Sequence, residues 1–158
     1  MHRFTSCAAF IPLSLALLAA HAPSAADGGV RAGPAPPPAY VQECGACHVA
    51  YPASMLPATS WQRLMANLQR HYGADASLDA STAQSLGVWL TAHAATGRRA
   101  TPPPEDRITR STWFVREHDE VAPSTWQRPS VKSAANCSAC HAGAEKGSFD
   151  EHQVRIPR

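Results

Sequence analysis

The chain has 158 residues, with 14 lysines and arginines, 12 aspartates and glutamates, and five cysteines. This near-neutral charge excludes the strong basic excess typical of nucleic-acid-binding proteins. No apolar stretch reaches the roughly 20 residues that a membrane-spanning helix needs, so no transmembrane segment is predicted.

Residues 1–26 have the pattern of a secretory signal peptide. A short basic start is followed by an apolar run of roughly 13 residues, and Ser24-Ala25-Ala26 supplies the small residues that signal peptidase recognises. Cleavage is predicted after Ala26, with Ala22 as the alternative, and a retained amphipathic anchor is the competing interpretation. We therefore expect an exported, periplasmic protein whose mature chain has 132 residues and four cysteines.

The mature chain begins with residues 27–38, which are rich in glycine, proline and alanine and are predicted to form a flexible arm. Helical patterns follow. Helices are predicted over residues 39–49, 59–73, 79–94 and 111–120, with a further one capped by Ser133. No stretch alternates with period two for long enough to predict a strand. The predicted fold class is mainly α, with little or no strand.

The clearest helical pattern covers residues 59–73. Thr59 and Gln62 match a capping box, and Gly73 stands where a helix commonly ends. Residues 101–106, which begin Thr-Pro-Pro-Pro, are predicted to be a linker. They divide the chain into an N-terminal lobe, residues 39–100, and a C-terminal lobe, residues 107–158.

All four cysteines of the mature chain lie in two copies of the pentapeptide Cys-x-x-Cys-His. The copies are Cys44, Cys47 and His48, and Cys137, Cys140 and His141. Disulfides are one explanation for an exported chain, and a tetrahedral zinc site built from two Cys-x-x-Cys knuckles is another. Neither requires a histidine directly after each second cysteine.

Covalent haem attachment uses every residue of this motif. Two thiols bond the porphyrin vinyl groups, and the next imidazole reaches the iron from the same side. Two covalently bound haem c groups are therefore predicted, with the four cysteines as thioether links and with His48 and His141 as proximal iron ligands. The apolar porphyrins would also complete the core of a small, alanine-rich domain.

The second axial ligand of each iron decides the function, because a histidine or methionine there is typical of an electron carrier and an empty position of a ligand-binding or catalytic haem. The candidates in the mature chain are His71, His93, His118, His152, Met55 and Met65. Sequence pattern favours His71, at the end of an apolar helix face, and His118, after the cluster Trp113-Phe114-Val115. Sequence pattern alone does not exclude His93 as a ligand.

Four stretches of the chain resemble the small periplasmic dihaem cytochromes c. They are CGACHVAYP, LPATSWQRLMANLQRHYGADASLD, RITRSTWFVREHDE and NCSACHAGAEKGSFDEHQVRIPR, which together span nearly the whole mature chain. The resemblance implies a mostly helical, two-lobed fold with one haem per lobe and two histidines on each iron. It implies that the distal ligands are His71 and His118, and it implies no role for His93 or His152.

The resemblance further implies a protein that passes electrons between redox partners and is not an enzyme. The partners it implies include a membrane cytochrome b and a small exported monohaem cytochrome that binds oxygen. The alternative is a dihaem peroxidase or reductase, or a gas-binding haem protein, with one open iron site. Glu117 and Asp119 would be its acid or base candidates, although a solvated helix face explains them more simply.

Overall fold

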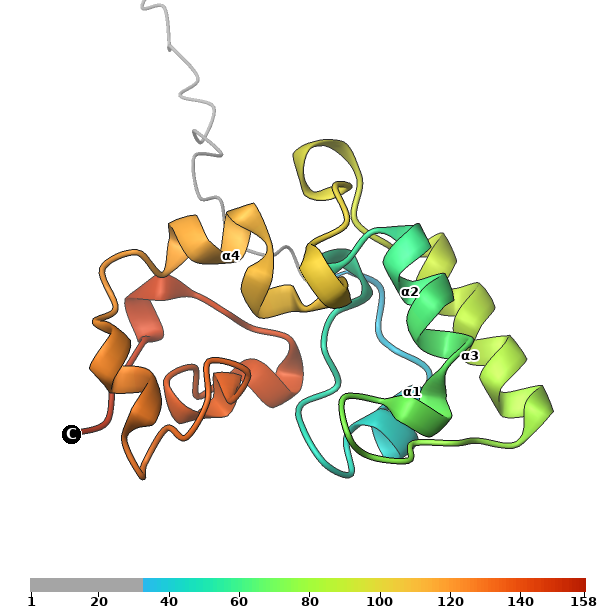
Figure 1. The fold of residues 1–158 in the computed structure, drawn as a ribbon, viewed down its shortest axis with the longest axis horizontal. Helices are drawn as coiled ribbons and strands as arrows, with labels where there is room; N and C mark the ends of the chain where they lie inside the picture. The colour runs from blue at the N-terminus through green and yellow to red at the C-terminus, as the bar shows by residue number, and fades with distance from the viewer. Residues whose placement is uncertain (1–32) are drawn as a thin grey trace, which may run out of the picture.

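The computed structural model describes residues 33–158. The predicted signal peptide and the first part of the predicted arm, residues 27–32, lie outside the described residues. Figure 1 shows two halves side by side, with the chain from blue to yellow forming one half and the orange and red segments forming the other.

Four α-helices lie in the described part of the chain: α1 Pro38–Cys44, α2 Ala58–Met65, α3 Ala80–Ala92 and α4 Thr112–Glu117. Nine short 3-10 helices supply most of its other regular structure: η1 Ala53–Met55, η2 Leu68–Arg70, η3 Gly97–Arg99, η4 Pro104–Asp106, η5 Ile108–Arg110, η6 Pro123–Gln127, η7 Cys137–Ala139, η8 Ala144–Lys146 and η9 Glu151–Gln153. Between residues 33 and 158 the only β pairings are isolated bridges. The prediction of a mainly α fold is confirmed.

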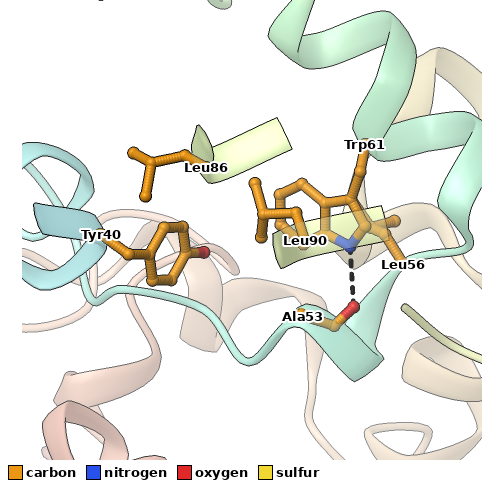
Figure 2. Close-up of a cluster of buried hydrophobic side chains, with 6 residues drawn as sticks. All are labelled: Tyr40, Ala53, Leu56, Trp61, Leu86 and Leu90. Carbon is orange, nitrogen blue, oxygen red and sulfur yellow. Dashed lines mark hydrogen bonds between the residues drawn. The ribbon is translucent and has the colours of Figure 1, made fainter. Parts of the chain in front are cut away.

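The first half is built on α2 and α3, which pack side by side (Figure 1), and α1 also contacts α3. Leu86 and Leu90 are spaced by one helical turn, so both point from α3 into the same core, where each is 1% exposed. Trp61 of α2 meets them there and donates its indole N–H to the Ala53 carbonyl at 2.7 Å (Figure 2). Tyr40 of α1 belongs to the same buried cluster (Figure 2).

The second half has less regular structure and a smaller core. Trp113 and Phe114 are the buried residues of α4, and Met55 from the first half packs with them. Ile108 contacts the cores of both halves. The chain end is tied back to this half, because Arg128 donates through Nη1 to the Pro157 carbonyl at 2.8 Å. The two halves therefore share apolar contacts.

Several helices are shorter than predicted. The helix predicted over 59–73 ends at Met65, and Asn67, with φ −140° and ψ 36°, separates it from η2. Thr59 lies inside α2 and no side chain caps this helix, whose N-cap position is Pro57. Thus the capping-box prediction was wrong, because Pro57 already fixes the extended backbone that precedes the helix.

The other helix ends show the same trend. The first motif extends beyond α1, which stops at Cys44 instead of Val49. The second motif lies on a 3-10 turn instead of an α-helix, and Ser133 accepts a hydrogen bond from the Ala135 N–H in a local turn. The start of α3 matches its prediction, since the Asp79 side chain caps it by accepting from the Thr82 N–H at 2.9 Å.

Residues 101–106, the predicted linker, pack on the first half through charged and aromatic contacts. Arg63 of α2 donates through Nε to Asp106 at 2.8 Å, and the Tyr72 hydroxyl donates to the Glu105 carbonyl at 2.9 Å. The Arg107 guanidinium lies 4.1 Å from the Tyr72 ring centroid. Within the described segment, no helix is both long enough and apolar enough to cross a membrane.

Candidate haem-binding sites

The first Cys-x-x-Cys-His motif begins at the last residue of α1. Cys44 is half-buried, Cys47 is exposed, and His48 is half-buried in the bend that follows. Gly45 closes the helix by donating its N–H to the Val41 carbonyl at 2.9 Å. A methyl group at Gly45 would collide with that carbonyl oxygen, so the tight turn between the two cysteines depends on glycine.

The second motif forms a single tight turn. The His141 N–H donates to the Cys137 carbonyl at 2.9 Å, which brings both cysteines and the histidine onto one turn of chain. The tail supports this turn from the other side, because the Arg155 N–H donates to the Cys140 carbonyl at 2.9 Å and Val154 bridges to His141. No local sequence pattern signalled this long-range pairing.

The cysteines support neither alternative chemistry. None of the four cysteines is paired with another cysteine, so the motifs do not form disulfides. No three His, Cys, Asp or Glu side chains between residues 33 and 158 converge as a metal ion would require, whereas a structural zinc site needs four ligands. Burial raises the pKa of the Cys44 and Cys137 thiols to about 11, so both side chains favour the neutral form.

The structure brings the motif histidines opposite two other imidazoles. The ring centroids of His48 and His71 are 6.2 Å apart, and those of His118 and His141 are 6.1 Å apart. Two imidazoles on opposite sides of one metal, each with a metal–nitrogen distance of about 2 Å, have ring centroids about 6 Å apart. Both pairs therefore have the spacing of two axial ligands of one metal, and each lies beside a pair of cysteines.

The backbone orients these imidazoles through their Nδ1 atoms. His48 Nδ1 lies 2.7 Å from the Val49 carbonyl, and His118 Nδ1 lies 2.9 Å from the Phe114 carbonyl one turn earlier. A histidine that donates from Nδ1 to a carbonyl presents an unprotonated Nε2 to a metal. These two side chains therefore suit axial ligation.

The other member of each pair has a buried Nδ1 without a partner among residues 33–158: His71 in the first pair and His141 in the second. Burial lowers the pKa of both imidazoles, and the facing histidine lowers it further. Both effects favour the neutral imidazole, which is the form that binds a metal.

In each pair one histidine has a stacked aromatic ring and the other has an edge-on ring, but the two pairs differ in which histidine carries the stacked ring. In the first pair, Tyr51 stacks on the motif residue His48, with centroids 4.7 Å apart and planes at 17°, while Tyr72 meets His71 edge-on. In the second pair the motif residue His141 receives the edge contact, from Phe149. The stacked ring there belongs to Phe114, which lies 4.0 Å from His118 at 17°.

The remaining candidate ligands lie apart from these pairs. His93 directly follows α3, with its ring 4.9 Å from Trp89 and Nδ1 2.8 Å from the Trp89 carbonyl. His152 is exposed on η9. Met55 is buried in the second core and Met65 packs against the first. Glu117, the acid considered for the alternative function, pairs with Arg116 at the surface.

The chain is similar to known dihaem cytochromes c. A family profile described as dihaem cytochrome c matches residues 40–149. A dihaem cytochrome c structure from Shewanella baltica OS155 is 43% identical, with a TM-score of 0.67, and covers 76% of this chain and 92% of its own. A structure of DHC from Rhodobacter sphaeroides is 44% identical, with a TM-score of 0.64, and covers 73% of this chain and 98% of its own. No curated protein matches the chain.

Proposed function

Because this chain belongs to the dihaem cytochrome c family, whose members are haem electron carriers with two haem c groups, we propose that it is a periplasmic carrier with two histidines on each iron. The thioether links would be Cys44 and Cys47 for the first haem, and Cys137 and Cys140 for the second. The axial ligands would be His48 with His71, and His141 with His118.

The spacing of the two imidazole pairs carries the proposal. Centroids 6.2 Å and 6.1 Å apart match two ligands on one metal. Haem c supplies reversible one-electron chemistry, and the chain determines which axial positions stay open. Histidines that hold both sides of each iron leave no coordination position for a substrate, which favours an electron carrier over an enzyme.

The ligand type also sets the expected potential range. A thioether favours reduced iron, so two imidazoles hold an iron at lower potential than a histidine and a methionine do. The Nδ1 contacts of His48 and His118 with carbonyls add to this effect, because they make the imidazoles stronger donors. Two low-potential haems are therefore expected.

Carbon monoxide binding to the reduced protein separates the proposal from its alternative. A protein with four histidine ligands shows no rapid spectral change, and its oxidised EPR spectrum contains two low-spin centres. His71→Ala and His118→Ala each open one site, so each should make one haem bind carbon monoxide. A rapid reaction of the wild-type protein at either haem would favour a peroxidase, reductase or gas-binding function instead.

His152→Ala is the matched control, because it removes an exposed histidine on η9. It should leave the carbon monoxide behaviour and both EPR centres as in the wild type. A site opened by this variant would contradict the proposed ligand set.

Export and redox partners form the second part of the proposal. They rest on the predicted signal peptide, residues 1–26, and on the family resemblance. The partners would be a membrane cytochrome b as donor or acceptor and a small oxygen-binding monohaem cytochrome. Mixing the reduced protein with such a monohaem cytochrome in a stopped-flow instrument should show concentration-dependent oxidation of this chain. No electron exchange with either partner would contradict this part.

A further inference from the structure

Tyr51 contacts both candidate haem sites, although it belongs to the first half. Its ring stacks on His48 of the first motif, with centroids 4.7 Å apart and planes at 17°. Its hydroxyl donates to the carbonyl of Ala135 at 2.7 Å, across 84 residues of sequence. Ala135 precedes Cys137 of the second motif by two residues. One side chain therefore touches an imidazole of one site and the backbone that leads into the other.

The backbone of Tyr51 is held as well. The Tyr40 hydroxyl donates to the Tyr51 carbonyl at 2.7 Å, and Tyr40 is 2% exposed in α1, four residues before Cys44. The first motif helix thus sets where Tyr51 lies. Movement of α1 would be transmitted through Tyr51 to the segment before Cys137.

The apolar surroundings reinforce this link. Tyr51 packs against the buried cluster of the second half, which contains Met55, Trp113 and Phe114. Phe114 in turn stacks on His118 at 4.0 Å. The rings that stack on His48 and His118 therefore belong to one continuous packed region between the two sites.

From these contacts we infer that Tyr51 is a positioning residue that holds the two haem sites in a fixed position relative to each other. Its ring sets the plane of the His48 imidazole, and its hydroxyl anchors the backbone that enters the second motif. The inference about the ring rests on the proposed function, since it takes His48 as an iron ligand. The inference about the hydroxyl does not.

Tyr51→Phe tests the hydroxyl, because it keeps the ring. The reporters are the Cys140 and His141 amides, which both donate to the Cys137 carbonyl. Losing one exposed hydrogen bond should speed their exchange about fivefold, measured by NMR on the reduced, haem-loaded protein. The EPR signature of the first haem should stay as in the wild type, because the stack on His48 is retained.

Tyr72→Phe is the matched control. Tyr72 also meets an imidazole of the first site and also donates its hydroxyl to a backbone carbonyl, that of Glu105. Its acceptor is in the segment before the second half and not next to the second motif. This variant should leave exchange at Cys140 and His141 unchanged. Equal exchange in Tyr51→Phe and Tyr72→Phe would overturn the proposed bridge.

Tyr51→Leu tests the ring. It should alter the EPR signature of the first haem, whereas Tyr51→Phe should preserve it, so the conservative variant acts as the rescue. An unchanged first-haem signature in Tyr51→Leu would refute the role of the ring. If Tyr51→Leu does not accumulate with both haems, Tyr51→Gln, which also lacks an aromatic ring, replaces it, and the hydroxyl test in Tyr51→Phe is unaffected. A wild-type protein with an open, high-spin iron would refute the proposed ligands. The amide exchange experiment would still test whether the Tyr51 hydroxyl links the first half to the second motif.

Discussion

The two halves of the molecule present the same pair of facing imidazoles on different scaffolds. In the first half, α2 and α3 pack around Leu86, Leu90 and Trp61, and His71 follows η2 outside any α-helix. In the second half, His118 directly follows the short helix α4, and a 3-10 turn carries the motif. The centroid distances nonetheless agree within 0.1 Å. The spacing is thus common to both halves, while the surrounding elements are free to differ.

The halves differ in how the paired rings are turned. The imidazole planes meet at 28° in the first pair and at 72° in the second. The stacked aromatic ring lies on the motif histidine in the first pair and on the other histidine in the second. Local packing therefore sets ligand orientation separately in each half, so two haems of one type would have distinct electronic environments. Four experiments test this contrast.

Removal of one haem should have the largest effect, and the effect should be unequal. Cys137→Ser with Cys140→Ser should yield a one-haem protein whose second half is unfolded, because that half buries few apolar residues of its own. Cys44→Ser with Cys47→Ser should leave α2 and α3 partly protected. Limited proteolysis with a haem assay measures both outcomes. Equal protection in the two variants would contradict the difference in cofactor dependence.

Exchange of one distal histidine for methionine should shift a single haem. His71→Met and His118→Met should each raise one midpoint potential by on the order of 100 mV, within the range of about 0.8 V that axial ligands span. The rise should be larger for His118→Met, because His118 Nδ1 contacts the Phe114 carbonyl whereas His71 Nδ1 has no partner among residues 33–158. Spectroelectrochemistry resolves the two waves. Equal shifts of both haems in either variant would argue against the pairing.

Substitution of one tryptophan in each half compares how much a buried indole contributes to the stability of each core. Trp61→Phe leaves the Ala53 carbonyl without its donor and should cost about 1–3 kcal/mol. Trp113 Nε1 is buried without a partner in the segment from 33 to 158, so Trp113→Phe removes no hydrogen bond within it and should cost less. Thermal midpoints of the haem-loaded proteins give the order. The reverse order would contradict the larger role assigned to the Trp61 hydrogen bond.

The helix caps give the smallest effect and a pH signature. Asp79 caps α3, and hydrogen bonds from Ser81 and Thr82 lower the pKa of its carboxyl. A lowered folded pKa means that this stabilisation is present above the ordinary value of about 4 and is lost as pH falls below it. Asp79→Ala should therefore lower the thermal midpoint by a few degrees at pH 7, and this gap should narrow in acid.

Ser111→Ala, which removes the neutral cap of α4, is the matched comparison. Ser111 accepts from the Phe114 N–H, and its hydroxyl does not titrate in this range. Its effect on the thermal midpoint should be the same at every pH. A pH-independent effect of Asp79→Ala would show that the carboxylate charge contributes nothing to the cap.

Local sequence predicted some element boundaries well and others poorly. Asp79 and Ser111 mark the starts of α3 and α4 because their side chains bond to amides only three residues away. The helix predicted over 59–73 ends early at Met65, since the chain turns at Asn67 to bring His71 towards His48. The contact between His71 and His48 is a tertiary contact, so the helical periodicity of residues 59–73 does not predict it.

The sequence by itself determined the cofactor chemistry, because the five consecutive residues of Cys-x-x-Cys-His contain both the haem-attaching cysteines and the proximal histidine. It also determined the helical class, since apolar periodicity and caps are local properties. Only the tertiary structure decided which imidazoles face each other, that Tyr51 reaches Ala135, and that the tail pairs with the second motif. Those contacts join residues 13 to 84 positions apart, and their formation depends on the packing of both halves.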